Sequence, residues 1–321
     1  MKRFFRKILI ITVSVIVLFF ILMLINYHFV GNQYKFNYQA SLLDKIERLE
    51  SIEGPKLILI GHSNLAFGMD SEMLEKAIGM PVVNLGLHGG LGNAFHEEIA
   101  KPYIRKGDIV IICHSFFADD GSIEDPSLAW ITVDNNIKLW RIISIKDYWN
   151  MIKAYPKYFR DSLYMKITGT GNQDSGGSYS RNAFNKYGDV VVKPEEGRMD
   201  PEVFFGDTES NNVEVPRIGD TCVRRLNDLN EFITARGATM LVAAYPIAYG
   251  EYSSFDRSDF YRFKNDLDIS LDCDVISDYT DYFFGYDLFY DTKLHLTAEG
   301  TYKRTKQLIE DLESWKSQLQ G

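Results

Sequence analysis

Four short apolar runs, separated by segments with helical periodicity, constrain the fold of this chain more than any other feature. The runs alternate little between apolar and polar residues, and they cover residues 56–60, 81–85, 108–113 and 239–245. Strands that are apolar on both faces are typical of parallel sheets, because helices cover both sides of such sheets. Helical patterns fall at residues 70–78, 91–104, 220–236, 257–268 and 297–318. This alternation predicts an α/β domain with a mostly parallel sheet, in which sites form at the carboxyl ends of the strands.

A long segment separates the third apolar run from the fourth. Its length of about 125 residues exceeds what a crossover or a structureless loop needs, so residues 115–218 are interpreted as an insertion. The first half is rich in Trp and Tyr and is expected to be largely helical. Its aromatic residues are interpreted as a helical core, with stacking on sugar rings as the alternative. The second half, residues 169–212, is rich in Gly, Ser, Asn and Asp.

The N-terminus carries an uncharged apolar segment behind a basic cluster. No residue from Ile8 to Ile25 is charged, and these 18 residues at about 1.5 Å each cover most of a hydrocarbon core about 30 Å thick. No small-residue cleavage site follows, which favours an uncleaved anchor over a signal peptide. The positive-inside rule places residues 1–7 in the cytoplasm and the rest of the chain outside. We therefore expect a single-pass anchor in the cell membrane over residues 8–26 and a domain over 55–321. Between them, residues 27–54 are expected to form a polar stalk with some helical character, which Leu42, Leu43, Ile46 and Leu49 indicate.

The charge of the external part limits its partners. Four of the 35 basic residues precede the anchor, which leaves 31 basic against 44 acidic residues, a net charge of −13, after it. Nucleic acid is therefore not an expected partner, whereas a neutral glycan is easier to accommodate. The cysteines are widely spaced at Cys113, Cys222 and Cys273, without metal-ligand spacing. We expect no metal, and the sequence leaves open whether Cys222 and Cys273 pair.

Two short motifs point to chemistry on a serine. Ser63 follows the first apolar run within Gly61-His62-Ser63-Asn64, and Asp291 precedes His295 near the last helical pattern. A serine hydroxyl is a weak nucleophile that needs an adjacent base, and a third group must orient that base. More than two hundred residues separate the two motifs, so only the fold can bring them together. The plainer interpretation of each motif is a helix cap or a turn.

A glycine-rich segment follows the second apolar run. It reads Asn84-Leu85-Gly86-Leu87-His88-Gly89-Gly90. Glycines at a strand end let backbone N–H groups approach a ligand, as an oxyanion hole requires. A tight turn that packs a helix against the sheet is the alternative interpretation.

Together these three elements resemble the SGNH, or GDSL-like, hydrolase superfamily. The motif around Ser63 stands where that family has its nucleophile block, Asn84 to Gly89 resembles the second block, and Asp291 with His295 stands where it has its Asp-x-x-His block. The resemblance implies a flavodoxin-like three-layer α/β/α sandwich and catalysis by Ser63, His295 and Asp291. It also implies an oxyanion hole made by the N–H groups of Ser63 and Gly89.

The closer resemblance is to membrane-anchored members that work outside the cell, such as the teichoic acid D-alanylation protein and acetyltransferases of exopolysaccharides. It implies transfer of an acyl group, in the first place acetyl, to a cell-envelope or secreted polysaccharide, with no cofactor. A multi-spanning membrane acyltransferase is the implied partner. The expected substrate-binding residues are Asn64, Asn84, His88 and Arg181.

The chain departs from the family pattern at two places. Its third strand ends in Cys113-His114-Ser115-Phe116 without the asparagine that the family uses as an oxyanion donor, and His114 is the candidate replacement. Three residues rather than two separate Asp291 from His295. These departures leave two alternatives open, a carbohydrate esterase that uses the same site and a non-catalytic scaffold that binds a glycan or an acyltransferase.

Overall fold

A five-stranded sheet forms the centre of the protein in a computed structural model, which describes residues 1–117, 120–192, 199–200, 217–251 and 255–319. All neighbouring strands in this sheet pair in parallel, in the order β2-β1-β3-β4-β6. The strands are β1 (Leu57–Gly61), β2 (Val82–Asn84), β3 (Ile109–Cys113), β4 (Thr239–Val242) and β6 (Asp274–Val275). A separate parallel pair joins β5 (Ile247–Ala248) to β7 (Phe283–Phe284).

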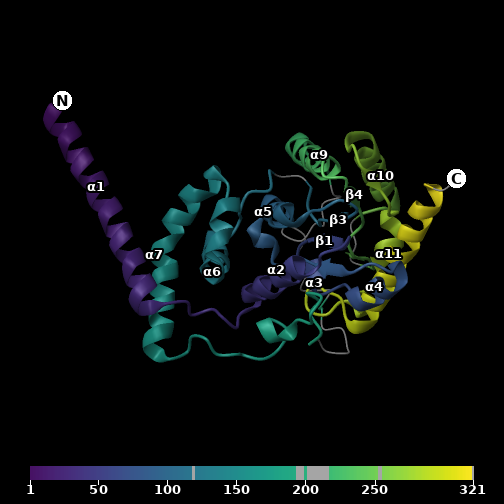
Figure 1. The fold of residues 1–321 in the computed structure, drawn as a ribbon, viewed down its shortest axis with the longest axis horizontal. Helices are drawn as coiled ribbons and strands as arrows, with labels where there is room; N and C mark the ends of the chain where they lie inside the picture. The colour runs from purple at the N-terminus through teal and green to yellow at the C-terminus, as the bar shows by residue number, and fades with distance from the viewer. Residues whose placement is uncertain (118–119, 193–198, 201–216, 252–254, 320–321) are drawn as a thin grey trace.

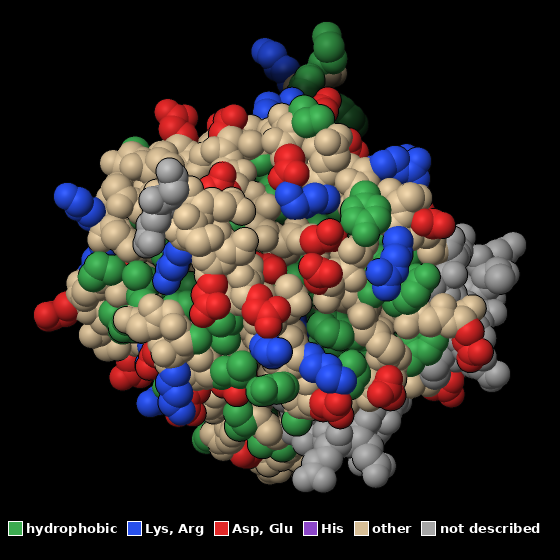
Figure 2. Space-filling model, turned by 90° about the vertical axis from the view of Figure 1, so that its right-hand side faces the viewer, with side chains coloured by type: hydrophobic (Ala, Val, Ile, Leu, Met, Phe, Trp, Pro, Cys, Tyr) green, Lys and Arg blue, Asp and Glu red, His purple; other side chains and the backbone are tan. Residues whose placement is uncertain are grey.

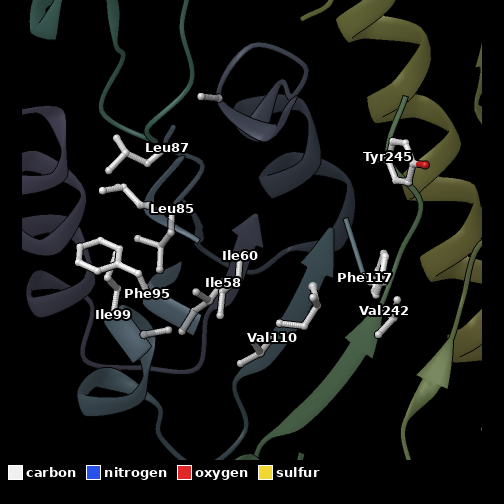
Figure 3. Packing of buried hydrophobic residues seen from close by; sticks show 14 of the residues in the cluster. Ile58, Ile60, Leu85, Leu87, Phe95, Ile99, Val110, Phe117, Val242 and Tyr245 are labelled. Atoms are coloured by element: carbon white, nitrogen blue, oxygen red, sulfur yellow. The ribbon is translucent and has the colours of Figure 1, made fainter. Parts of the chain in front are cut away.

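Helices cover both faces of the five-stranded sheet (Figure 1). Ile58 and Ile60 point to the face that carries the larger core, where Figure 3 shows them near Val110 and Val242. Leu57 and Leu59 point to the opposite face. Apolar residues of the larger core come from α2 (Ser41–Ser51), α5 (Asn93–Ala100), α9 (Asp220–Thr234) and α10 (Arg257–Ser270). Those of the opposite core come from α4 (Ser71–Ile78) and α11 (Ala298–Gln318).

The predicted α/β architecture is confirmed at this level. Each of the four apolar runs contains a strand, and each of the five helical patterns contains a helix, within a few residues of the expected bounds. The strands are buried on both faces, which explains why they alternate so little in sequence. The short strands β5, β6 and β7 were not predicted, since two residues provide too little pattern to recognise.

The expected polar stalk over residues 27–54 is wrong for its second half. Helix α2 lies within this segment and buries Leu42, Ile46 and Leu49 in the larger core. Lys45 is also buried, and its ammonium group donates to the carbonyl oxygens of Asn84 and Gly188 at 2.9 and 2.6 Å. The apolar stripe of this helix therefore belongs to the domain.

The insertion begins with helices, as expected. Its main elements are α6 (Pro126–Asn135) and the long α7 (Ile145–Thr168), which pack against each other. Trp130 is buried between them, with its ring 4.6 Å from Tyr155 and 5.5 Å from Tyr158. This packing supports the core interpretation of the aromatic cluster. The expected polar second half is described over residues 169–192 and 199–200, and its remainder lies outside the described residues.

The N-terminal apolar segment forms one continuous helix. Helix α1 (Lys2–Ile25) continues into a π-helical segment, η1 (Asn26–Val30), and is long and apolar enough to cross a membrane. Figure 1 shows α1 projecting away from the sheet and passing beside α7 near its own C-terminal end.

Candidate active site

Ser63 lies at the carboxyl end of a central strand. It is the first residue of α3 (Ser63–Ala66), which follows β1 after only one intervening residue, His62. Strand β1 lies between β2 and β3, so loops from three strands meet at this edge of the sheet. Because the first N–H groups of a helix have no partner within it, the backbone N–H of Ser63 is oriented for an external acceptor.

The fold brings Ser63, His295 and Asp291 together. Nε2 of His295 lies 2.8 Å from the Ser63 hydroxyl, and Nδ1 of the same ring lies 2.7 Å from Oδ1 of Asp291. A neutral imidazole that donates from Nδ1 to the carboxylate can accept the serine proton at Nε2. The extra residue between Asp291 and His295 does not prevent this contact, since a turn returns the His295 carbonyl oxygen to the N–H of Tyr290 at 2.8 Å. The arrangement has the geometry of a nucleophile, a base and an orienting carboxylate.

Tyr179 adds a fourth group to this chain of hydrogen bonds. Its hydroxyl donates to Oδ2 of Asp291 at 2.6 Å and lies 3.3 Å from Nδ1 of His295. Burial would raise the pKa of Asp291, but the hydrogen bonds from His295 and Tyr179 outweigh burial and hold this pKa below its usual value. Burial and the Asp291 charge raise the pKa of Tyr179, so its hydroxyl remains a donor. The carboxylate is thus ionised and held at both oxygens.

Two further residues, which were not predicted, position the groups of the candidate site. The ring of Phe67 stacks on the imidazole of His295, with centroids 4.1 Å apart and an interplanar angle of 11°. Arg304 is buried on α11, and its guanidinium donates to the carbonyl oxygens of Asn64, within α3, and of Gly68, just after it. Phe67 fixes the plane of the base, and Arg304 ties the turn that carries Ser63 to the last helix.

The glycine segment lies against the nucleophile turn. A β-carbon at Gly89 would lie 3.6 Å from Cγ of His62, and one at Gly86 would lie 2.5 Å from the backbone nitrogen of Ala66. Gly86 therefore permits two loops to pack closely, as expected if the glycine segment is a tight turn. Gly89 lies beside His62, the residue that precedes Ser63.

The expected substrate-binding role of Asn84 is not supported, because the structure uses its side chain internally. Its amide donates to the Leu65 carbonyl oxygen at 3.0 Å and to Asp189 at 2.8 Å, while its Oδ1 accepts from the N–H of Gly86 at 2.8 Å. The side chain is fully buried. Asn84 therefore joins the glycine segment, the nucleophile turn and the insertion.

Asn64 and Arg181 also differ from the expectation that they bind substrate. The Asn64 side chain is fully buried and donates to the Cys113 carbonyl oxygen at 3.1 Å. Arg181 holds Asp44 on α2 with two hydrogen bonds of 2.7 and 2.6 Å. A bidentate pair of this kind uses the N–H groups by which the guanidinium would otherwise hold a ligand. Both residues stabilise the fold around the site.

His114 is not placed as an oxyanion donor. Its ring has no exposed surface, and its Nε2 lies 2.9 Å from Oε1 of the buried Glu97. Arg225 approaches the other oxygen of Glu97 at 2.9 Å, so both His114 and Arg225 are held by this carboxylate of α5. A group that stabilises an oxyanion must face the substrate. The prediction for His114 is therefore wrong, because β3 directs this ring into the core.

A second serine–histidine contact lies beside the first. Ser115 approaches Nδ1 of His62 at 3.0 Å, and Nε2 of His62 donates to Oδ1 of Asn93 at 2.5 Å. The Asn93 amide donates in turn to the Phe116 carbonyl oxygen at 2.7 Å. Burial, with help from nearby histidines, lowers the pKa of His62, so its neutral ring accepts a hydrogen bond from the Ser115 hydroxyl. All three side chains are buried, and this relay holds the loops after β1 and β3 together.

His88 is the predicted substrate-binding residue that stays exposed near the triad. Its Nδ1 accepts from the N–H of Gly90 at 3.0 Å. Partial burial lowers the pKa of His88. The Asp125 carboxylate opposes this shift, and the nearby His295 adds to it. The exposed ring of His88 therefore lies near His295.

The described residues contain no group of three or more His, Cys, Asp or Glu side chains that could hold a metal ion. Neither Cys222 nor Cys273 forms a disulfide in the part of the chain that the structure describes.

Sequence reasoning missed Tyr179, Phe67 and Arg304, whose roles depend on long-range contacts. A weak signal existed for Tyr179, which begins the insertion segment Tyr179 to Asn185 that resembles the SGNH family loosely. No protein-family model matches the chain, and no curated protein matches it.

Proposed function

We propose that this protein is a membrane-anchored serine acyltransferase that acts outside the cell and moves an O-acyl group, in the first place acetyl, onto a cell-envelope or secreted polysaccharide. The observation that carries the proposal is the position of His295, which bridges the Ser63 hydroxyl and the Asp291 carboxylate at 2.8 and 2.7 Å. An activated serine requires both contacts.

The chemistry follows from these contacts. Ser63 Oγ bonds to the carbonyl carbon of the acyl donor while its proton moves to Nε2 of His295, and the carbonyl electron pair moves onto oxygen. The backbone N–H groups of Ser63 and Gly89 are the proposed donors to that oxyanion. The intermediate collapses as the bond to the leaving oxygen breaks and His295 returns the proton to it. The oxygen of a sugar hydroxyl then bonds to the acyl carbon of the Ser63 ester while its proton moves to Nε2 of His295. The bond from that carbon to Ser63 Oγ breaks, and His295 returns the proton to Ser63.

Shielding from water favours transfer over hydrolysis. An acyl-enzyme must be protected from water if a sugar hydroxyl is to capture the acyl group. His295 is only 6% exposed, since Phe67 covers one face of its ring and Tyr179 of the insertion closes the Asp291 side. An insertion that contributes to the site in this way suits a transferase.

The fold and the apolar helix support the remaining parts of the proposal. The strand order β2-β1-β3-β4-β6 agrees with the flavodoxin-like order, and the resemblance to the SGNH superfamily predicts that architecture. Helix α1 is a candidate anchor, and the N-terminal basic residues favour an external domain. A membrane acyltransferase that supplies the acyl group is the proposed partner.

One observation favours the scaffold as a second candidate. The family places a side-chain oxyanion donor after the third strand, but here His114 is bound to Glu97 and Ser115 to His62. The oxyanion hole of this protein would then consist of backbone donors alone. A site that only binds a glycan needs no side-chain oxyanion donor, so its absence is what the scaffold candidate predicts.

A fluorophosphonate probe separates these candidates. The full-length protein in detergent is expected to gain one adduct on Ser63, detected by intact mass and peptide mapping, and Ser63→Ala and His295→Ala should abolish it. Ser115→Ala is the matched control, because Ser115 also contacts a histidine but is buried, and it should label like the wild type. Absence of an adduct on folded protein would favour the scaffold. Release of acetate from simple esters without a sugar acceptor would favour the esterase.

A further inference from the structure

Helix α7 presents an apolar stripe to solvent. Ile145, Trp149 and Ile152 lie at positions i, i+4 and i+7 and therefore share one face. They are 89%, 62% and 41% exposed, and Ile167 continues the stripe near the end of the helix at 75%. The opposite face of α7 buries Met151, Tyr155 and Tyr158, so the exposed stripe is not needed for the core. Exposed apolar residues gathered on one helix face indicate an interaction surface.

The stripe lies next to the candidate membrane helix. The ring of Phe19 in α1 packs on Tyr155 of α7, with centroids 5.0 Å apart, and η1 also contacts α7. Phe19 lies six residues, or about 9 Å along the axis, before Ile25 at the end of α1. With α1 across a bilayer and Ile25 at its outer edge, the middle of α7 therefore lies within about 10 Å of the hydrocarbon boundary. Ile152 and Trp149 lie only one to two turns from Tyr155.

The charge of α7 is opposite to that of the whole protein. The helix carries five basic and two acidic residues, whereas the chain has a net charge of −9. The basic residues include Lys146 and Lys157, whose side chains are 77% and 62% exposed. The Lys153 ammonium lies 5.3 Å from the centre of the Trp149 ring. Lysine beside tryptophan on an amphipathic helix is the composition of segments that lie in the membrane interface.

The far side of the molecule differs from this helix. Figure 2 shows the face to the right in Figure 1, where acidic and basic side chains are interspersed and hydrophobic ones are scattered. The segregation of apolar and basic residues on α7 is therefore not the general character of the surface.

We infer that the solvent-facing side of α7, defined by Ile145, Trp149, Ile152 and Ile167, lies at the boundary between lipid headgroups and acyl chains of the membrane that α1 spans. The inference rests on the proposed membrane span of α1 and is independent of the proposed acyl transfer. Two points of attachment, α1 and α7, would fix the orientation of the domain, since a single helix leaves it free to rotate about the anchor. The edge of the sheet that carries Ser63 would then keep a constant height above the lipid.

Spin-label accessibility tests this placement on the full-length protein in vesicles of phosphatidylcholine with phosphatidylglycerol. Nitroxides are attached at Trp149→Cys and, in a second variant, at Ile145→Cys, in a Cys273→Ser background because Cys273 is the partly exposed cysteine. Ile269→Cys on α10, also 75% exposed, is the matched control outside the proposed interface. Val15→Cys in α1 tests the span itself.

Oxygen, which concentrates in lipid, and a nickel chelate, which stays in water, are used as collision partners. The α7 labels are expected to show a ratio of oxygen to nickel accessibility several-fold above that of the Ile269→Cys label. Equal ratios at the α7 and control positions, with a lipid-exposed label at Val15→Cys, would overturn the inference and leave the span intact. Shielding of the α7 labels from both reagents would assign the face to a protein partner and also overturn it. A water-exposed label at Val15→Cys would remove the span and the inference together, without bearing on the reactivity of Ser63.

Discussion

Removal of the Tyr179 hydroxyl measures how much its hydrogen bond to Asp291 contributes to the reactivity of Ser63. In Tyr179→Phe, Oδ2 of Asp291 loses a donor at 2.6 Å, while Oδ1 keeps its contact with His295. A hydrogen bond to a charged group contributes about 1.5–3 kcal/mol, and water can replace part of it where the group is accessible. Tyr179 is 48% exposed and the Asp291 side chain 27%, so the lower limit applies. A loss of about 1.4 kcal/mol corresponds to a tenfold slower reaction of Ser63.

The assay is the second-order rate constant for fluorophosphonate labelling of Ser63 at neutral pH. Tyr290→Phe is the matched control. Tyr290 directly precedes Asp291 in the chain, but its hydroxyl contacts Ser178 at 3.2 Å rather than Asp291 or His295. Tyr179→Phe should label about tenfold more slowly, and Tyr290→Phe should match the wild type. Equal rates for all three proteins would refute the positioning role. Faster labelling in Tyr179→Phe would show that the hydroxyl weakens the base more than it orients it.

The remaining predictions concern pH and stability. Because the folded-state pKa of Asp291 is lowered, its ionisation stabilises the fold fully above its usual value of 3.8, and this contribution is lost as the pH falls through the lowered pKa. Thermal unfolding midpoints of wild type and Tyr179→Phe should therefore differ by a constant amount at neutral pH and converge below about pH 4; a difference that widens in acid would contradict this sign. Asp108→Ala leaves Lys56 without its partner at 2.8 Å in a site where both side chains are fully buried, so the free energy of unfolding should fall by about 3–5 kcal/mol. Glu299→Ala, which breaks an exposed pair with Lys303, should cost less than about 1 kcal/mol in the same denaturant titration; similar losses would mean that burial is not the cause. Gly86→Ala places a β-carbon 2.5 Å from the Ala66 nitrogen and should reduce both stability, by about 1–3 kcal/mol, and Ser63 labelling, whereas Gly54→Ala meets no atom within 4 Å and should change neither.

Local pattern was enough to predict most of the secondary structure. Periodicity depends on which faces of an element are buried, and parallel strands such as β1 and β3 are buried on both. The pattern also indicated helical character where α2 lies, but its polar residues, among them the buried Lys45 and Ser41, led us to expect a stalk rather than a core helix. A lysine can be buried there because two carbonyl oxygens from distant segments accept its hydrogen bonds, and no local rule contains that information.

The sequence alone also identified the residues that meet at the site, since Ser63, Asp291 and His295 each stand at a strand or helix end with the right chemistry. The contacts of the residues around Ser63, Asp291 and His295 were decided by the tertiary structure. Tyr179 reaches Asp291 across 112 residues, and Ser63 reaches His295 across 232. His114, one residue past the end of β3, turns into the core toward Glu97, whereas the sequence placed it at the oxyanion. The physical reason is that side-chain direction at a strand end and the partners of buried polar groups depend on packing between distant elements, which the spacing of residues along one segment does not contain.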